Sequence, residues 1–557
     1  MTGNDASRSQ LRLWRFIAAG ILLASLALAT LVPVYTDEIG WRLQMRAAVD
    51  GVDIMFNDIC GPNTLARPIW FMMPVRWFSA TANIALADPL FVRVVGVACA
   101  LLWVGLFLAL IRRVEPDADR RARMQTILLS LLAMGLLPFL LVLSRPEQPA
   151  MLATTAIVLT ALLPYPPRQA TVWAWAKVVL ILVLAAIALS YHIKGVLYSV
   201  VAFACLAVCA GGRGTVLPRV VGCAALVLLT LSAAQYWIER FQCPGDAKLA
   251  AMLARENLAA VIAGGGSATD LVLQAIRGAN PLNYVELAAP TVWPMSDHPV
   301  PTVFGAIMNP VVGVFLFASW FVAFVLTVLA LARHLFQTGW RGLFEPRVPI
   351  ILAILGCVFV WGASQLNKNT YEASHVLPML AVAFALAWSL PNADRSNTSQ
   401  IGGVLPLAFV TIALICQVLV LGVSIVPLVQ AAQTPGYAEE QANSVSLVGY
   451  DIVRQDITRA MDQAGIPSDR PLHRLLIDDL TYLALQRHRL PLHRLGVLST
   501  WNGSIDDPVE YLRSRDSDGV VVGCAYLPPD MRAAASRSGE ICAISRAGLD
   551  RLAAARG

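Results

Sequence analysis

The chain has 557 residues, of which 57% are hydrophobic and only 14% are charged, and its formal net charge is +6. Soluble proteins carry charge on roughly a quarter of their residues, so this composition excludes an ordinary soluble protein and indicates a chain that crosses a lipid bilayer. The arginines are scattered and are not interleaved with aromatic residues, which excludes a nucleic-acid-binding protein.

Eleven apolar runs approach the roughly 17 to 25 residues that a helix needs to cross the hydrocarbon of a bilayer. They are residues 16–35, 91–111, 125–143, 150–164, 172–191, 196–211, 219–237, 301–332, 348–366, 375–390 and 402–427. The runs 150–164 and 196–211 are short and need local thinning of the bilayer, so the helix count is approximate. The first run lacks a small-residue cleavage site, and we interpret it as a retained span. We expect an α-helical polytopic membrane protein with about 11 transmembrane helices.

The orientation follows from the positive charges of the short loops. With a cytoplasmic N-terminus, about 16 arginines and lysines lie on the cytoplasmic side and about 3 lie on the other side, as the positive-inside rule demands. Eleven spans then place the C-terminus outside the cytoplasm. We expect a multi-pass protein of the bacterial inner (plasma) membrane, with its longer soluble segments on the outer face.

Two long outer segments, 36–90 and 238–300, separate spans of the membrane domain 1–427. Amphipathic stretches such as Trp70–Ala80 suit short helices that lie in the membrane interface. The second segment contains helix-like pieces at Ala247–Ile262 and up to Arg277, with Gly264–Gly266 between them. This triple glycine follows no strand and lacks a trailing Lys-Ser/Thr, so we interpret it as a flexible joint and not as a phosphate loop.

The tail, residues 428–557, changes character. Strand signals occur at 475–477, 519–524 and 541–544, and helical patterns occur at 447–464, 481–487, 507–515, 530–536 and 548–555. Strands that alternate with helices predict a small extracytoplasmic α/β domain. Asp478 and Asp479 stand between a strand and a helix, where we expect a helix N-cap.

Ten cysteines divide between the two environments. Six lie in predicted spans, and the four others, Cys60, Cys243, Cys524 and Cys542, all lie on the predicted outer side. An even set on the oxidising face predicts disulfides. We expect Cys524 to pair with Cys542, and Cys60 is a candidate partner for Cys243.

Asp37 and Glu38 follow the first run directly, in the sequence PVYTDEIGW. Carboxylates at this depth must be solvated, paired or bound to a metal. Adjacent carboxylates repel one another, which favours the uptake of a proton and suits a general base. The alternative is a solvated boundary at the end of a span.

Three outer turns between spans also carry charges. They are Ser144–Gln148, Tyr191–Gly195 and the segment from Asn367 to His375, and their candidate side chains are Arg145, Glu147, His192, Lys194, Lys368 and His375. Each turn alone is compatible with a harmless polar connection. Together they place cations and carboxylates on one face, and cations there suit the phosphate of a lipid, whose oxygens accept charge-assisted hydrogen bonds.

With these features the chain resembles the GT-C-type membrane glycosyltransferases, which include protein O-mannosyltransferases and lipid A aminoarabinose transferases. Asp37-Glu38 matches the acidic motif that this superfamily carries in its first outer loop. The segment from His375 to Ala387 (HVLPMLAVAFALA) resembles a late-span pattern in which a basic residue precedes a Leu-Pro-rich helix, although His375 stands where an Arg-Tyr pair is expected. The resemblance covers the overall plan and indicates no subfamily.

The resemblance implies a sugar donor linked to polyprenyl phosphate and an acceptor hydroxyl on a lipid, glycan or protein. Asp37 or Glu38 would be the catalytic base, and Arg145, His192 and Lys194 would stabilise the leaving phosphate. Glu147 would orient Arg145 or share in base catalysis. A divalent metal near the carboxylates is compatible with the sequence but is not required by it. The main alternative is a transporter or a flippase for a lipid-linked glycan, which would be expected to carry charges within its spans and matching repeats.

Overall fold

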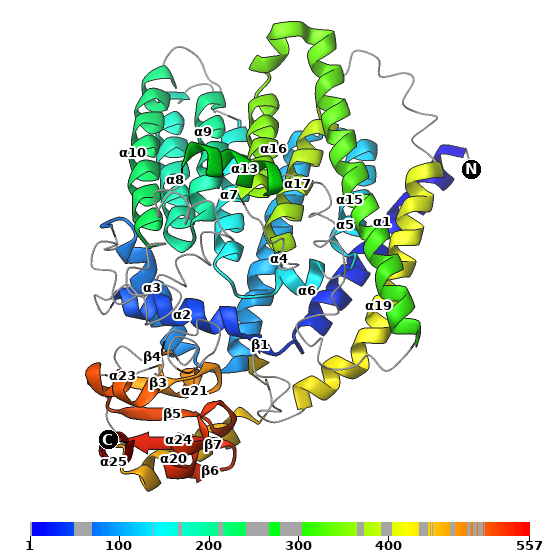
Figure 1. Cartoon of the computed structure of the whole chain (residues 1–557). Coiled ribbons are helices and arrows are strands. Elements are labelled where there is room, and N and C mark those ends of the chain that lie inside the picture. Colours follow the sequence, from blue (N-terminus) through cyan, green and yellow to red (C-terminus); the bar gives the residue numbers. More distant parts are fainter. Residues whose placement is uncertain are drawn as a thin grey trace.

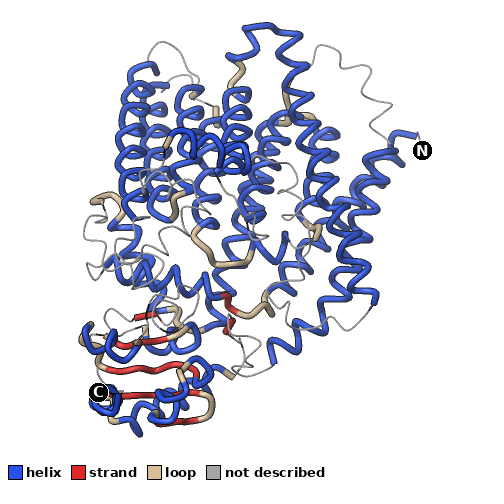
Figure 2. Tube along the Cα trace, in the orientation of Figure 1, coloured by secondary structure: helices blue, strands red, loops and turns tan. Residues whose placement is uncertain are grey.

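The computed structural model describes residues 3–49, 69–135, 137–164, 170–209, 215–240, 267–278, 303–364, 372–391, 404–433, 444–445, 447, 449–467, 474–486, 492–493, 498, 505 and 507–556. Long helices pack side by side and form the larger part of the molecule, and a small sheet with short helices lies at one end of them (Figures 1 and 2). The N-terminus lies at the end of the bundle that is farther from this sheet (Figure 1).

Each of the eleven predicted runs lies mainly in helix, but the run 16–35 extends too far, because α1 ends at Ala29 and Val34–Tyr35 form the strand β1. The helices are α1 (Gly3–Ala29), α4 (Pro89–Val114), α5 (Ala118–Leu132), α6 (Leu137–Leu141), α7 (Glu147–Leu162), α8 (Ala170–Tyr191), α9 (Lys194–Val208), α10 (Val216–Arg240), α15 (Val303–Thr338), α16 (Arg347–Ser364), α17 (Ala373–Trp388) and α19 (Val404–Gln433). Among the described residues, six helices, in α1, α4, α8, α10, α15 and α16, are long and apolar enough to cross a membrane. A polytopic helical membrane protein is therefore confirmed, whereas the count of about eleven crossings stays a prediction.

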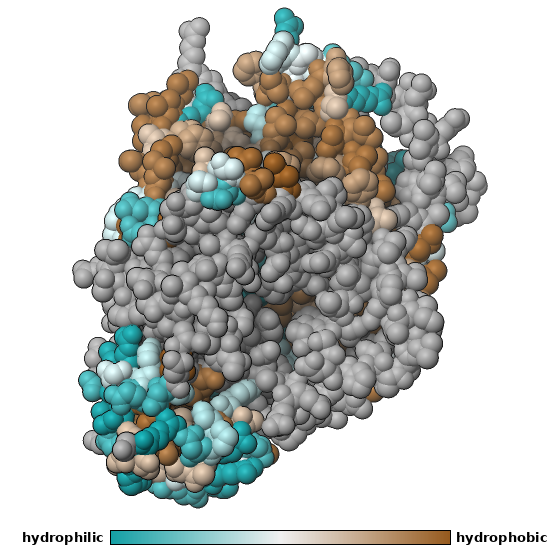
Figure 3. Space-filling view, viewed as in Figure 1, coloured by the Kyte–Doolittle hydropathy of each residue, from teal (hydrophilic) through white to brown (hydrophobic). Residues whose placement is uncertain are grey.

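The surface of these helices agrees with a lipid environment. Large apolar side chains such as Leu102 on α4, Val183 on α8 and Leu228 on α10 are exposed. The described surface over the helices is hydrophobic, whereas the described surface of the C-terminal part is largely hydrophilic (Figure 3). A continuous apolar surface of this kind marks contact with a membrane or with a protein partner.

The run 125–143 was predicted as one span, and this prediction is wrong. The structure breaks the run into α5 and the five-residue α6, with Gly135 between them at a positive φ of 66°. The Gly135 N–H donates to the Gln417 side chain of α19 (2.6 Å), and the Gln417 amide donates to Ser25 of α1 (3.1 Å). A backbone group that leaves a helix at membrane depth needs a protein partner, and Gln417 supplies it.

Two short helices follow α1 in the first outer segment. They are α2 (Thr36–Val49) and α3 (Met73–Ala85), and α13 (Ala268–Gly278) lies in the second outer segment. Trp70, Trp77 and Phe78 are exposed in and beside α3, as aromatic anchors in a membrane interface would be. Of the predicted stretch Trp70–Ala80, residues 73–80 lie in α3, and the position of this helix in the membrane interface stays a prediction. Residues 247–262 and 264–266 lie outside the described residues.

The C-terminal part of the chain contains a five-stranded sheet of order β4-β3-β5-β7-β6. Its strands are β3 (Leu475–Ile477), β4 (Leu492–His493), β5 (Gly519–Gly523), β6 (Ser536–Ser538) and β7 (Ile541–Ser545), and its helices are α20 (Tyr450–Ala464), α21 (Asp479–Leu485), α23 (Pro508–Ser514), α24 (Pro529–Ala534) and α25 (Arg546–Arg556). β3 pairs in parallel with β4 and β5, and β7 pairs antiparallel to β5 and β6. The three predicted strands are confirmed, but the two or three residues of β4 and β6 are too short for a sequence pattern. Asp478 accepts the Thr481 N–H (2.9 Å), which confirms the predicted N-cap.

The structure forms the predicted disulfide between Cys524 and Cys542, which joins the end of β5 to β7. We expect both thiols to resist alkylation in protein isolated without reductant and to react after reduction, as measured by mass spectrometry. Free thiols at both positions before reduction would contradict the predicted oxidising location of this part of the chain. Cys60 and Cys243 lie outside the described residues, so their pairing stays a prediction.

The orientation also stays a prediction and has a direct test. A reporter that is active only outside the cytoplasm, fused after residue 430, is expected to give a signal, because the arginine bias places this point outside. A reporter that works only in the cytoplasm should be silent there. The opposite pair of results would reverse the orientation and the side of the membrane on which the candidate site lies.

Candidate functional site

The acidic motif lies where α1 gives way to α2. The strand β1 (Val34–Tyr35) separates the two helices, and Asp37 and Glu38 lie in the first turn of α2. Glu38 is fully buried and accepts two hydrogen bonds from the Arg93 guanidinium, at 3.0 and 2.7 Å. The Asp37 side chain is outside the part of the chain that the structure describes.

Arg93 of α4 is the residue that holds Glu38, and the sequence analysis did not select it. Its guanidinium also donates to the carbonyl oxygens of Val32 (2.8 Å) and Pro33 (2.7 Å), so it satisfies the backbone where α1 ends. An arginine inside the apolar run 91–111 was a usable signal in the sequence, because an ionisable residue in such a run needs a partner. The structure shows that Arg93 is fully buried.

The acidic motif is joined to the turn that carries Arg145. The Ser144 N–H donates to Glu38 Oε1 (2.6 Å), and Arg42 donates to the Ser144 hydroxyl (3.0 Å) and to the Glu38 carbonyl oxygen (2.7 Å). The first outer segment and the turn between α6 and α7 therefore form one hydrogen-bonded unit, with Arg145 next along the chain.

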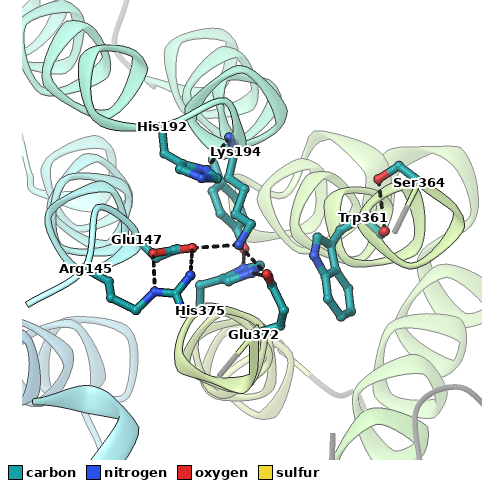
Figure 4. A network of polar contacts seen from close by, with 9 residues as sticks. Arg145, Glu147, His192, Lys194, Trp361, Ser364, Glu372 and His375 are labelled. Atoms are coloured by element: carbon teal, nitrogen blue, oxygen red, sulfur yellow. Dashed lines mark hydrogen bonds and ion pairs between the residues drawn. The ribbon is translucent and has the colours of Figure 1, made fainter. Parts of the chain in front are cut away.

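Five residues form a buried network that we call the ionic cluster. They are Arg145, Glu147, Lys194, Glu372 and His375 (Figure 4). Arg145 donates through Nε and a terminal nitrogen to Glu147, at 3.3 and 3.2 Å. Lys194 Nζ lies between two carboxylates, at 2.8 Å from Glu147 Oε1 and in contact with Glu372. The His375 Nε2–H donates to Glu372 (2.6 Å).

The cluster forms where three helices begin. Glu147 is the first residue of α7, Lys194 is the first residue of α9, and Glu372 is the N-cap of α17. Carboxylates are favourable at a helix N-terminus because they face its partial positive charge, whereas a lysine is unfavourable there. Lys194 is therefore held at its position by the two carboxylates and not by its own helix.

Burial and the neighbouring charges together set the charge states at the turns. Burial alone would raise the pKa of the Glu372 carboxyl, but the Lys194 ammonium and the His375 hydrogen bond hold it well below its ordinary value, so Glu372 is ionised. Burial lowers the pKa of His192 to about 3, which leaves this imidazole neutral at physiological pH. With Glu147 paired to two cations, the cluster combines two cations with two carboxylates.

Histidine 375 has a protein partner on each ring nitrogen. Because Glu372 is an acceptor only, His375 carries its proton on Nε2, and Nδ1 accepts from the Tyr198 hydroxyl (2.5 Å). The imidazole is almost fully buried, and the Trp361 ring packs edge-on against it at 5.6 Å. His375 is thus placed to orient Glu372, and through it Lys194.

The structure brings most of the predicted candidates together. Arg145, Glu147, Lys194 and His375 are brought together in the ionic cluster, and Glu38 is joined to them through Ser144. Lys368, together with the Asp37 side chain, lies outside the described part. Glu372 was part of a predicted polar turn but was not selected, although its spacing of three residues from His375 on one helix face was visible in the sequence.

His192 lies beside the cluster and faces an aromatic group. Its Nδ1 accepts the Lys194 N–H (3.2 Å), and its ring lies 6.1 Å from Trp41 of α2 and 6.2 Å from Trp237 of α10. The described residues contain no group of three His, Cys, Asp or Glu side chains that could hold a metal ion. The carboxylates described at this site are neutralised by arginine and lysine.

No family model matches the chain, and no curated protein matches it. Among solved structures, the oligosaccharyltransferase of Archaeoglobus fulgidus in complex with Zn and sulfate is similar with a TM-score of 0.40 and 12% identity, over 90% of this chain and 68% of that one. The Archaeoglobus fulgidus oligosaccharyltransferase AglB, solved with an inhibitory peptide and a dolichol-phosphate, gives a TM-score of 0.38 and 13% identity over 91% and 69%. The arabinosyltransferase EmbB of Mycobacterium smegmatis gives 0.29 and 13% over 77% and 42%. These enzymes are GT-C membrane glycosyltransferases.

Proposed function

We propose that this protein is a membrane glycosyltransferase that moves a sugar from a polyprenyl-phosphate-linked donor to an acceptor hydroxyl at the outer face of the membrane. Because the TM-scores of the solved structures lie below 0.5, the support comes from this chain's own residues and from the resemblance of its sequence plan. The observation that carries the proposal is the hydrogen-bonded junction of Glu38 with Ser144, which sets the acidic motif beside the buried cations of the ionic cluster.

In the proposed reaction, Asp37 accepts the proton of the acceptor hydroxyl. The acceptor oxygen forms a bond to the anomeric carbon of the sugar while the bond from that carbon to the phosphate oxygen breaks. The bond electrons leave with the polyprenyl phosphate, which needs no general acid because a phosphate is already a good leaving group. We choose Asp37 over Glu38 because Glu38 is buried and held by Arg93 on both carboxylate oxygens.

Arg145 and Lys194 are the proposed ligands of the donor phosphate. Both cations are already oriented by carboxylates, so a phosphate would meet cationic groups that are held in place. The phosphate, Glu147 and Glu372 would then all interact with the two positive charges. Preorganised donors of this kind stabilise the charge that grows on a leaving group without further reorganisation. His375 supports Lys194 through Glu372, and Lys368 stays a candidate for the same role.

Replacing Arg145 by alanine is expected to raise the KM for the donor by roughly 10- to 100-fold, because a hydrogen bond from a cation to a phosphate is typically worth that factor. The measurement is the initial rate at varied donor concentration in vesicles. Arg113→Ala is the control. Arg113 donates to the carbonyl oxygen of Leu162 (2.6 Å), the last residue of α7, whereas Arg145 lies just before the first residue of that helix. Equal donor KM values in Arg145→Ala and in the parent would remove Arg145 from the site.

The proposed function itself is tested with the purified protein in vesicles that contain polyprenyl-phosphate sugars. Transfer of a labelled sugar to an acceptor, with release of one polyprenyl phosphate per sugar, is the expected result. Movement of the intact donor across the bilayer without its cleavage would instead support the flippase alternative.

A further inference from the structure

The C-terminal domain is paired to the chain directly before the acidic motif. β1 forms an antiparallel pair with β2 (Ser444–Val445), in which Val34 stands opposite Val445 and Tyr35 opposite Ser444. Only Thr36 separates this pair from Asp37. The backbone that leads into the acidic motif is therefore fixed from the side of the tail.

The same domain shares a hydrophobic core with α2. Ile39 and Leu43 of α2 are buried in one cluster with Tyr482 and Leu483 of α21. α2 lies between the helical bundle and this part of the tail (Figure 1). The buried face of the helix that carries Asp37 and Glu38 thus packs on the C-terminal domain.

Polar contacts follow the same path from the tail to the site. Arg42 of α2, the helix that packs on the tail, donates to both the Glu38 carbonyl oxygen and the Ser144 hydroxyl. A second contact links Arg454 of α20 to the Ala87 carbonyl oxygen (3.1 Å), just before α4, the helix that supplies Arg93.

From this continuous path we propose that the C-terminal domain is a positioning element, which sets the acidic motif of α2 relative to the ionic cluster. This inference rests on the proposed function for its catalytic consequence. The structural part of the proposal does not depend on the function. It states that a loss of packing between α2 and α21 displaces the first turn of α2, whereas an equal loss of packing elsewhere in the domain does not.

Two leucines offer a matched pair of variants in the full-length protein. Leu43 packs in the core that α2 shares with the tail, whereas Leu512 of α23 is buried in the cluster on the other side of the C-terminal sheet. Leu43→Ala and Leu512→Ala remove the same atoms from packed cores, so they should destabilise the domain alike. Only the first variant loosens α2.

The first readout does not need activity. A cysteine placed by Asp37→Cys is labelled with a membrane-impermeant maleimide, and the labelling of protein without this cysteine is subtracted. Leu43→Ala is expected to change the labelling rate by about tenfold or more, since such a deletion shifts a local packing equilibrium by at least that factor. Leu512→Ala should leave the rate within about twofold of its parent. Equal rates in both variants would overturn the proposal, even if the protein transfers sugar.

The second readout uses the native Asp37. Leu43→Ala is expected to lower kcat roughly tenfold or more with little change in the donor KM, because the displaced group is the proposed base and not a phosphate ligand. Leu512→Ala should retain the parent kcat. Transfer by the parent with unchanged kcat in Leu43→Ala would reject the positioning role and keep the proposed function. A shift in labelling without any transfer by the parent would keep the positioning role and reject the function.

Discussion

Replacing Asp37 by asparagine is expected to lower the kcat for sugar transfer by roughly 10²-fold or more. Asparagine keeps the size of the side chain and its hydrogen bonding but cannot accept the proton of the acceptor hydroxyl. Expression and the thermal unfolding of the purified protein should stay close to those of the parent. The measurement is the single-turnover rate with saturating donor, which separates the chemical step from donor binding.

Glu38→Gln is the informative comparison, because it changes the neighbouring carboxylate in the same way. Glu38 is fully buried and paired with Arg93, so its amide leaves a buried cation without its counter-charge. Breaking a buried pair in this way typically costs about 3–5 kcal/mol of stability. We therefore expect Glu38→Gln to fail mainly in folding and Asp37→Asn to fail in chemistry. A stable Asp37→Asn/Glu38→Gln double variant with the parent rate would refute the proposed mechanism.

Local patterns predicted the elements of this chain well because its solvent is largely lipid. Long apolar runs have few alternatives to a helix in a bilayer, since each backbone N–H and C=O must be satisfied within the segment. One exception was the run 125–143, where the helix breaks at Gly135. Gln417 satisfies the broken backbone from a distance of 282 residues along the chain, and no local pattern contains that contact.

The candidate site was predicted only in part for the same reason. Charges at the outer turns singled out Arg145, Glu147 and Lys194, because a charge in a short turn is visible locally. The ion pairs themselves cannot be read from a local sequence pattern. Lys194, for example, contacts Glu372, which lies 178 residues further along the chain. Arg93 and Glu38 are likewise separated by 55 residues. The sequence thus predicted which turns carry these charged side chains, whereas the fold decides which carboxylates they pair with.

Lys194→Met is expected to lower the free energy of unfolding by about 3–5 kcal/mol, because it leaves the buried Glu372 carboxylate without its ammonium partner and leaves Glu147 with Arg145 as its one cation in the ionic cluster. Methionine keeps much of the volume of the lysine stem, so the loss reports charge and not a cavity. Lys177→Met is the matched control. Lys177 Nζ donates to the carbonyl oxygens of Ala161 (3.4 Å) and Leu163, which leave no charge behind.

The measurement is thermal unfolding in detergent of four proteins: the parent, Lys194→Met, Glu372→Gln and the double variant. Removing Glu372's charge as well should recover part of the loss, because the carboxylate that lost its ammonium partner is then neutral. A coupling of about 0.5–3 kcal/mol is typical for residues in contact. Recovery in the double variant would show that Lys194 and Glu372 act as a pair inside the fold, so that any donor phosphate binds to a site that is already assembled. Additive losses, or a Lys194→Met variant no less stable than Lys177→Met, would instead mean that the cluster is solvated enough to tolerate unpaired carboxylates. In that case Lys194 would bind the donor phosphate without stabilising the fold. Lys194→Ala would then have a higher donor KM and an unchanged stability.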